Sequence, residues 1–338
     1  MPLLSCSVLA HSWEEEAVPL LYSRSESVGR MTFDFPEKKN ALDQDARKEM
    51  ERIVTQVRDD DRVRALLITG AGGAFCAGGD ISTFAGSSPV AMRDRMKQQH
   101  RVTRMLYDLE KPVVAAVAGP AFGVGFNIAL LADVILAAPS ARFCQAYARV
   151  AIVPDGGGLY LLARTVGTQR AKAMFLTAQV IDAQEAHDLG IVHAIHEEDV
   201  LDAEADALAA RLAEGPTRAF GLGKSMLNRG MDCDFATYLE IEATAEAHIP
   251  APAAGADTAR SSSMMTQSRA ESCRMIFRSE PTFRAIADML RPCFFKSWIK
   301  TISLSPFTCL PLSVARSGHQ ACIPRQRQFR INEVRNCP

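Results

Sequence analysis

The spacing of hydrophobic and polar positions predicts strands separated by helices in the first half of the chain. Alternation in "GRMTFDF" predicts a half-buried strand over 29–35, and the helical spacing of Met50, Ile53, Val54 and Val57 predicts a helix after it. Compact apolar runs predict further strands over 62–70, 111–119 and 133–138, with helices between them over 92–109 and 123–132. This alternation favours an α/β architecture.

The second half of the chain has a different pattern. From Gly158 to about His248 nearly every stretch has helical spacing, and beyond Ile249 the periodicity is lost among Pro, Ala, Gly, Ser and Arg. We therefore predict four segments: an N-terminal extension over 1–27, an α/β core over 28–200, a helical region over 201–250, and an atypical, poorly ordered basic tail over 251–338.

Composition is that of a globular protein with a sizeable core. The 338 residues are 48% hydrophobic and 23% charged, with a net charge of -1, so no nucleic-acid or membrane partner is expected. The charge is unevenly distributed along the chain, because the tail carries 13 Lys or Arg but only 5 Asp or Glu. The tail could be a poorly ordered extension or a basic arm that binds an acidic partner. We favour the poorly ordered extension, because the basic residues are not part of a recognisable motif.

Cysteine spacing and the N-terminus bear on the compartment. The nine cysteines form no CxxC pair, which argues against a disulfide framework or a metal site. The N-terminal apolar run lacks a preceding basic region and meets three glutamates, Glu14, Glu15 and Glu16, unlike a signal peptide. Since no apolar stretch approaches the ~20 residues of a membrane span, a cytoplasmic protein without a bound metal is expected.

Two glycine-rich loops follow predicted strands, "ITGAGGAFCAGGDIS" and "GPAFGVGFNIALL". Neither has the pattern of a phosphate-binding loop. Small residues let the backbone approach a ligand and expose its N–H groups. Together the loops could direct two donors at one oxygen, an oxyanion hole in which each donor contributes on the order of 3 kcal/mol.

A single carboxylate, Asp155, lies between a proline and three glycines in "AIVPDGGGLY". From these residues alone, Asp-Gly turn chemistry or capping of the following helix is the simplest interpretation. A catalytic acid in an exposed stretch of backbone is the alternative.

Five sequence motifs together indicate a known family: "PEKKNALD", "AFCAGGDIS", "KPVVAAVAGPAFGVGFNIALLADVILAA", "ARFCQA" and "VPDGGGLYLLARTVGTQRAKAMFLTAQVIDAQEAHDLGIVHAI". In this order the chain resembles the enoyl-CoA hydratase/isomerase, or crotonase, superfamily over roughly 28–248. The resemblance implies a spiral of ββα units with a C-terminal helical trimerisation region. It also implies acyl-CoA substrates, a homotrimer or hexamer, and no cofactor beyond the CoA of the substrate.

The resemblance also implies roles for particular residues. The family's oxyanion donors fall on the backbone N–H groups of Gly79 and Val124. Its substrate-binding positions fall on Lys39, Ala41, Ala77, Asp80, Ile81, Gly123, Asn127, Ala146 and Tyr147.

This chain departs from the hydratase pattern at both catalytic glutamates, whose positions hold Asn127 and Tyr147. Adding water requires groups that activate the water and deliver a proton, so a conventional hydration is not expected. Asp155 matches the functional aspartate of isomerases in the superfamily, including epoxyphenylacetyl-CoA isomerases. We therefore predict an enoyl isomerase with Asp155 as the base.

Other chemistries remain open. Hydratase activity is one. A dehalogenase that uses Asp155 together with His100, in the helix before "KPVV", is another, and a thioesterase that uses Asp155 is a third. We interpret His100 as a polar-face residue, and Cys76 and Cys144 as small apolar residues. A non-catalytic member of the family is the remaining alternative.

Overall fold

The computed structural model describes residues 20–84 and 88–249. Their main feature is a six-stranded sheet in the order β1-β2-β3-β4-β6-β9. These strands are β1 (Leu20–Ser25), β2 (Val28–Phe33), β3 (Ala65–Gly70), β4 (Val113–Val117), β6 (Val134–Ala137) and β9 (Ala194–Ile195). All neighbours are parallel except β1 and β2. The predicted α/β class is confirmed.

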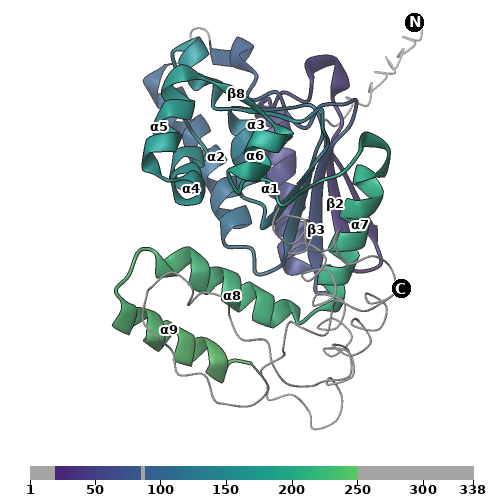
Figure 1. The fold of residues 1–338 in the computed structure, drawn as a ribbon, viewed down its shortest axis with the longest axis vertical. Coiled ribbons are helices and arrows are strands. Elements are labelled where there is room, and N and C mark those ends of the chain that lie inside the picture. Colours follow the sequence, from purple (N-terminus) through teal and green to yellow (C-terminus); the bar gives the residue numbers. More distant parts are fainter. Residues whose placement is uncertain (1–19, 85–87, 250–338) are drawn as a thin grey trace, which may run out of the picture. The chain divides into compact units, whose positions relative to one another are not determined.

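Helices cover both faces of this sheet, which explains why β4 is apolar at every position. On one face Leu66, Ile68 and Val113 pack with α1 (Gln44–Asp59), α2 (Pro89–Tyr107) and α3 (Val124–Leu130). On the other face Leu67 and Val114 pack against α7 (Glu198–Glu214) (Figure 1). The period-two alternation of β3 thus divides its side chains between two cores.

A smaller sheet has the order β5-β7-β8. It is formed by β5 (Pro120–Phe122), β7 (Arg142–Cys144) and β8 (Val180–Asp182). The remaining helices are α4 (Gly158–Val166), α5 (Thr168–Thr177), α6 (Ala183–Asp188), α8 (Thr217–Gly230) and α9 (Phe235–Ala247), and single 3₁₀ turns occur at Pro36–Lys38, Ile81–Phe84 and Ala146–Val150.

The observed elements differ from the expected ones at several places, and β5 and β7 were not expected as strands. The main sheet begins with β1, inside the segment interpreted as an N-terminal extension, and "LLYSRS" has no clear alternation that would mark it as a strand. The region read as almost all helix contains β8 and β9, which are three and two residues long and too short to show a period. Residues 1–19 and the predicted tail lie outside the described residues.

Among the helices that the structure describes, none combines the length and the apolar character needed to cross a membrane.

Candidate active site

The two glycine-rich loops lie directly against each other. Cys76 N–H donates to Pro120 O and Phe122 N–H donates to Cys76 O, both at 2.9 Å. A Cβ built on Gly125 would lie 2.3 Å from Cys76 O, so this close approach requires glycine. The pairing brings the segment after β3 beside the N-terminus of α3.

Two backbone N–H groups at this junction are available to a ligand. Leu42 pairs with the first loop through Gly78 O at 2.8 Å and Asp80 N at 2.9 Å, which leaves the N–H of Gly79 outside the pairing. Val124 opens α3, so its N–H is among those without an intrahelical acceptor. Within residues 20–84 and 88–249, neither N–H has a hydrogen-bond acceptor.

Asp155 lies half-buried in the connection before α4. The turn chemistry expected for this stretch is present: Gly156 and Gly157 have φ angles of 57° and 73°, and Gly158 N–H donates to Asp155 O at 3.2 Å. Asn127 Nδ2 also donates to Asp155 O, at 2.9 Å. This bond ties the loop to α3, so a turn and a positioned carboxylate occur together.

A chain of hydrogen bonds reaches the Asp155 carboxylate. Gln145 Nε2 donates to Asn127 Oδ1 at 2.9 Å, Asn127 Nδ2 donates to Tyr147 OH at 2.7 Å, and Tyr147 OH donates to Asp155 Oδ1 at 2.6 Å. Burial raises the pKa of Tyr147 above its usual value, and the charge of Asp155 raises it further. Tyr147 is therefore a neutral donor. Asn127 and Tyr147, which the resemblance aligns with the glutamates of hydratases, are therefore neutral side chains bonded to Asp155.

Two residues of this region were missed by the sequence analysis. Arg47 is 1% exposed, and its Nε donates to Oε1 of Gln99, which is 2% exposed, at 2.9 Å. Burial lowers the pKa of Arg47, and the charge of Asp155 opposes this shift. Arg47 lies three residues before Met50 and seven before Val54, on the buried face of α1. A charge on that face is the signal that could have identified it.

The expected CoA-binding segments are joined by backbone hydrogen bonds. Ala77 N–H donates to Lys39 O at 2.9 Å, which places "KKNAL" beside "CAGGD". Lys39 is exposed and so is Ile81, while Ala41, Ala77 and Asp80 are half-buried. Asp80 forms an ion pair with Lys38 at 3.6 Å.

The remaining predicted site residues border Tyr147 and the second loop. The ring of Tyr147 lies 3.7 Å from where a Cβ on Gly123 would be. Gly123 has a φ of 52° and is the N-cap of α3. Ala146 is half-buried and precedes Tyr147 in a 3₁₀ turn. Tyr147 is 5% exposed and Asn127 is fully buried.

The other candidate groups do not join this cluster. Burial raises the pKa of the Cys76 thiol to about 12 and also raises that of Cys144, so both thiols are neutral near pH 7. His100 is exposed on α2. In the described part of the chain, no group of three or more His, Cys, Asp or Glu is arranged to hold a metal ion.

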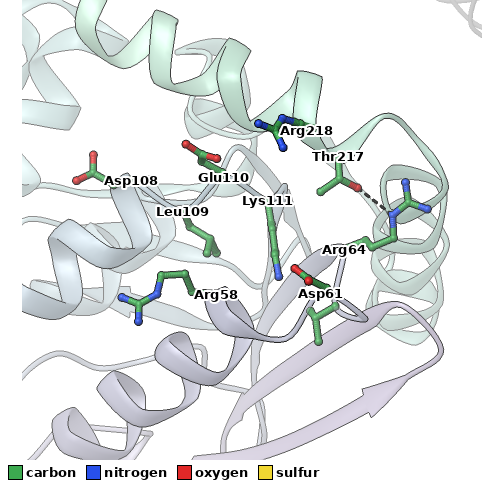
Figure 2. A pocket seen from close by; sticks show the side chains of 10 residues that line it. Arg58, Asp61, Arg64, Asp108, Leu109, Glu110, Lys111, Thr217 and Arg218 are labelled. Atoms are coloured by element: carbon green, nitrogen blue, oxygen red, sulfur yellow. Dashed lines mark hydrogen bonds between the residues drawn. The ribbon is translucent and has the colours of Figure 1, made fainter. Parts of the chain in front are cut away.

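A separate groove of about 530 Å³ lies between the end of α1, the connection from α2 to β4, and the start of α8 (Figure 2). Its lining includes Arg64, which donates to Thr217 Oγ1 at 3.0 Å, and it contains none of the residues predicted for the site. The side chains around it carry mixed charges. We interpret this groove as a gap that remains where α8 packs against the core.

Comparisons with known proteins agree on one family. A family model described as "Enoyl-CoA hydratase/isomerase" matches residues 23–259. The chain is 34% identical to the 1,2-epoxyphenylacetyl-CoA isomerase of Escherichia coli K12 over 64% of its own length and 84% of the relative. It is 37% identical to the short-chain-enoyl-CoA hydratase of Clostridium acetobutylicum, over 67% of its own length and 87% of the relative.

A solved structure supports the same assignment. The crystal structure of an enoyl-CoA hydratase/isomerase from Cupriavidus metallidurans CH34 superposes with a TM-score of 0.65 at 38% identity. The match covers 68% of this chain and 87% of that one.

Proposed function

The chain belongs to the enoyl-CoA hydratase/isomerase family, and we propose that within this family it acts as an isomerase that moves a double bond in an enoyl-CoA thioester. Asp155 is the base, and the N–H groups of Gly79 and Val124 hold the thioester oxygen. The observation that supports this assignment is that Asp155 is the acid reached by the polar chain through Asn127 and Tyr147, at positions where a hydratase carries its glutamates.

The proposed reaction needs one movable proton. The Asp155 carboxylate removes a proton from one carbon of the acyl chain, and the electron pair of the broken C–H bond moves into the thioester to form an enolate. The two N–H donors stabilise the negative oxygen. Asp155 then returns the proton two carbons further along the acyl chain, while the double bond re-forms one position closer to the thioester, so the mass of the substrate does not change.

Hydration is the second candidate, because relatives named hydratases match this chain as well as a relative named an isomerase does. Hydration requires the protein to orient and deprotonate water and to protonate the α-carbon. Asn127 and Tyr147 are neutral, and both are engaged in the polar chain. These contacts favour isomerisation over hydration.

The test is to give the purified protein a 3-enoyl-CoA and a 2-enoyl-CoA in separate reactions and to identify products by chromatography and mass. We expect double-bond migration at constant mass, with kcat reduced about a thousandfold in Asp155→Asn. The matched control is Asp94→Asn, which changes an exposed aspartate of α2 paired with Lys97, and it should retain full activity.

The opposite outcome is a gain of one water by the 2-enoyl ester that survives Asp155→Asn. That result would return "PDGGG" to turn chemistry and establish hydration by other groups. Chloride release from a haloaromatic acyl-CoA, lost in Asp155→Asn, would establish the dehalogenase alternative instead.

We further propose that the protein works in the cytoplasm as a homotrimer or hexamer, without a metal and without a cofactor other than the CoA of its substrate.

A further inference from the structure

A buried positive charge lies beside the residue proposed as the first oxyanion donor. A Cβ built on Gly79 would lie 2.9 Å from Arg47 Nη2. Arg47 is in the first turns of α1, where the positive end of the helix dipole disfavours a cation. A buried guanidinium at such a place is costly unless something compensates its charge.

The guanidinium is only partly satisfied by the protein. Its Nε donates to Gln99 Oε1 at 2.9 Å, and its Nη1 donates to Asp43 O at 3.4 Å. In the part of the chain that the structure describes, Nη2 has no hydrogen-bond acceptor and no carboxylate lies within 4.0 Å of Arg47. One edge of the guanidinium therefore remains available to a ligand.

Two further polar groups lie close to the loop that carries Asp155. The hydroxyl of Thr103 is buried and has no hydrogen-bond partner among the described residues. This Oγ1 lies 3.7 Å, and Gln99 Nε2 lies 3.6 Å, from the position of a Cβ on Gly156. Val124 Cγ2 lies 3.6 Å from the same point. Arg47, Gln99 and Thr103 thus border the same region as the proposed base and oxyanion donors.

Compensation of Asp155 is the competing explanation for Arg47. The charge of Asp155 does favour the charged form of Arg47. However, Tyr147 already donates to Asp155 Oδ1, and Arg95 of α2 places a second guanidinium within electrostatic range of Arg47 and Asp155. Compensation of Asp155 also leaves the buried Thr103 hydroxyl unexplained.

We infer that Arg47, with Gln99 and Thr103, binds a carboxylate on the acyl group, so that the substrate is the CoA thioester of a short unsaturated dicarboxylic acid. A guanidinium fork matches a carboxylate with two parallel hydrogen bonds. Since Arg47 Nη2 adjoins Gly79, only a few carbons separate the carboxylate from the thioester. This inference rests on the proposed function for the position of the thioester.

The test compares binding of two saturated thioesters, glutaryl-CoA and pentanoyl-CoA, by isothermal titration calorimetry. Both acyl chains have five carbons and differ only in a terminal carboxylate or methyl group. We expect glutaryl-CoA to bind at least about tenfold more tightly than pentanoyl-CoA. Arg47→Met should remove this preference, and the matched control Arg52→Met, at an exposed arginine of α1 paired with Glu49, should keep it.

The inference is overturned if the unaltered protein binds pentanoyl-CoA as tightly as glutaryl-CoA, a comparison that needs no variant. It is also overturned if Arg47→Met, shown to be folded by circular dichroism, weakens both ligands equally. In Arg47→Lys we expect an intermediate preference, because the charge remains but the fork is lost. Neither ligand has a double bond to move, so the result is independent of whether Asp155 catalyses isomerisation.

Discussion

Tyr147 donates its phenolic hydroxyl to Oδ1 of Asp155 at 2.6 Å. The same hydroxyl accepts a hydrogen bond from Asn127 Nδ2, so its single proton is directed at the carboxylate. This fixes the orientation of Asp155 and leaves Oδ2 as the oxygen for proton transfer. In this arrangement Tyr147 positions the proposed base and does not react itself.

Replacing Tyr147 by Phe should therefore reduce kcat more than it changes KM. We expect kcat for 3-enoyl-CoA isomerisation to fall about tenfold, the equivalent of one lost hydrogen bond to a charged group, while KM changes less than about twofold. Steady-state kinetics over a range of substrate concentrations measures both constants.

Tyr160→Phe is the matched control, because Tyr160 OH also donates to an aspartate, Asp232, at 2.6 Å, but outside the candidate site. It should leave both constants unchanged. An unchanged kcat in Tyr147→Phe would show that Asp155 does not need this contact.

The activity should also be sensitive to the contact between the two glycine-rich loops. In Gly125→Ala the new methyl group would meet Cys76 O at 2.3 Å and push the two oxyanion donors apart. A displacement of about 1 Å costs on the order of a hundredfold in rate, which we expect in kcat/KM. Gly223→Ala is the control: a Cβ at that position of α8 has no neighbour within 4 Å, and alanine favours a helix, so activity should persist.

Much of the order of strands and helices can be predicted from the hydrophobic periodicity of the sequence, and the structure explains why. The strands β2, β3, β4 and β6 and the helix α1 each bury a regular set of apolar side chains, so their patterns in the sequence are strong. β1, β8 and β9 carry weak patterns because they are short or mostly exposed. No local sequence pattern indicates which helices cover which face of the sheet.

The candidate site was less accessible from the sequence. Asp155, Gly79 and Val124 could be proposed because the resemblance to a family aligns them with known roles, and those roles stay predictions here. The contact from Arg47 to Gln99 joins α1 to α2, 52 residues apart, and no local pattern predicts it. The bonds from Asn127 through Tyr147 to Asp155 likewise depend on tertiary packing.

An ion pair between α8 and Asp133, the residue directly before β6, predicts a pH-dependent stability. Lys224 Nζ lies 2.7 Å from Asp133 Oδ2, which also accepts from Val113 N–H. Burial raises the pKa of Asp133 and lowers that of Lys224. A carboxyl group with a raised folded-state pKa costs stability when ionised, so this cost is present above that pKa and is relieved as the pH falls.

Lys224→Met removes the charge that compensates ionised Asp133, so the destabilisation caused by burying this carboxylate should become measurable. We expect a loss of about 2 kcal/mol in the free energy of unfolding at pH 7, below the range for a fully buried pair because both side chains keep some solvent contact. The loss should shrink toward pH 4, as measured by urea denaturation at several pH values. The double variant Asp133→Asn/Lys224→Met should recover stability at pH 7, and a pH-independent loss would contradict this explanation.

The C-terminal helices carry apolar side chains that predict self-association. Leu227 in α8 is 73% exposed, Met231 directly after it is 67% exposed, and Phe235 at the start of α9 is 74% exposed. These three exposed side chains lie close together in the sequence, and a patch of such side chains is typical of an interaction surface, so the proposed homotrimer or hexamer would cover them. Phe235→Glu should therefore shift the protein to a monomer in light scattering coupled to size-exclusion chromatography, because a charge cannot be buried in an apolar interface without a partner.

Leu21→Glu, at a 51% exposed position of β1, changes a comparable residue away from these helices and should leave the mass unchanged. If the unaltered protein is already a monomer, or Phe235→Glu retains the mass of the oligomer, then α8 and α9 do not form the subunit interface.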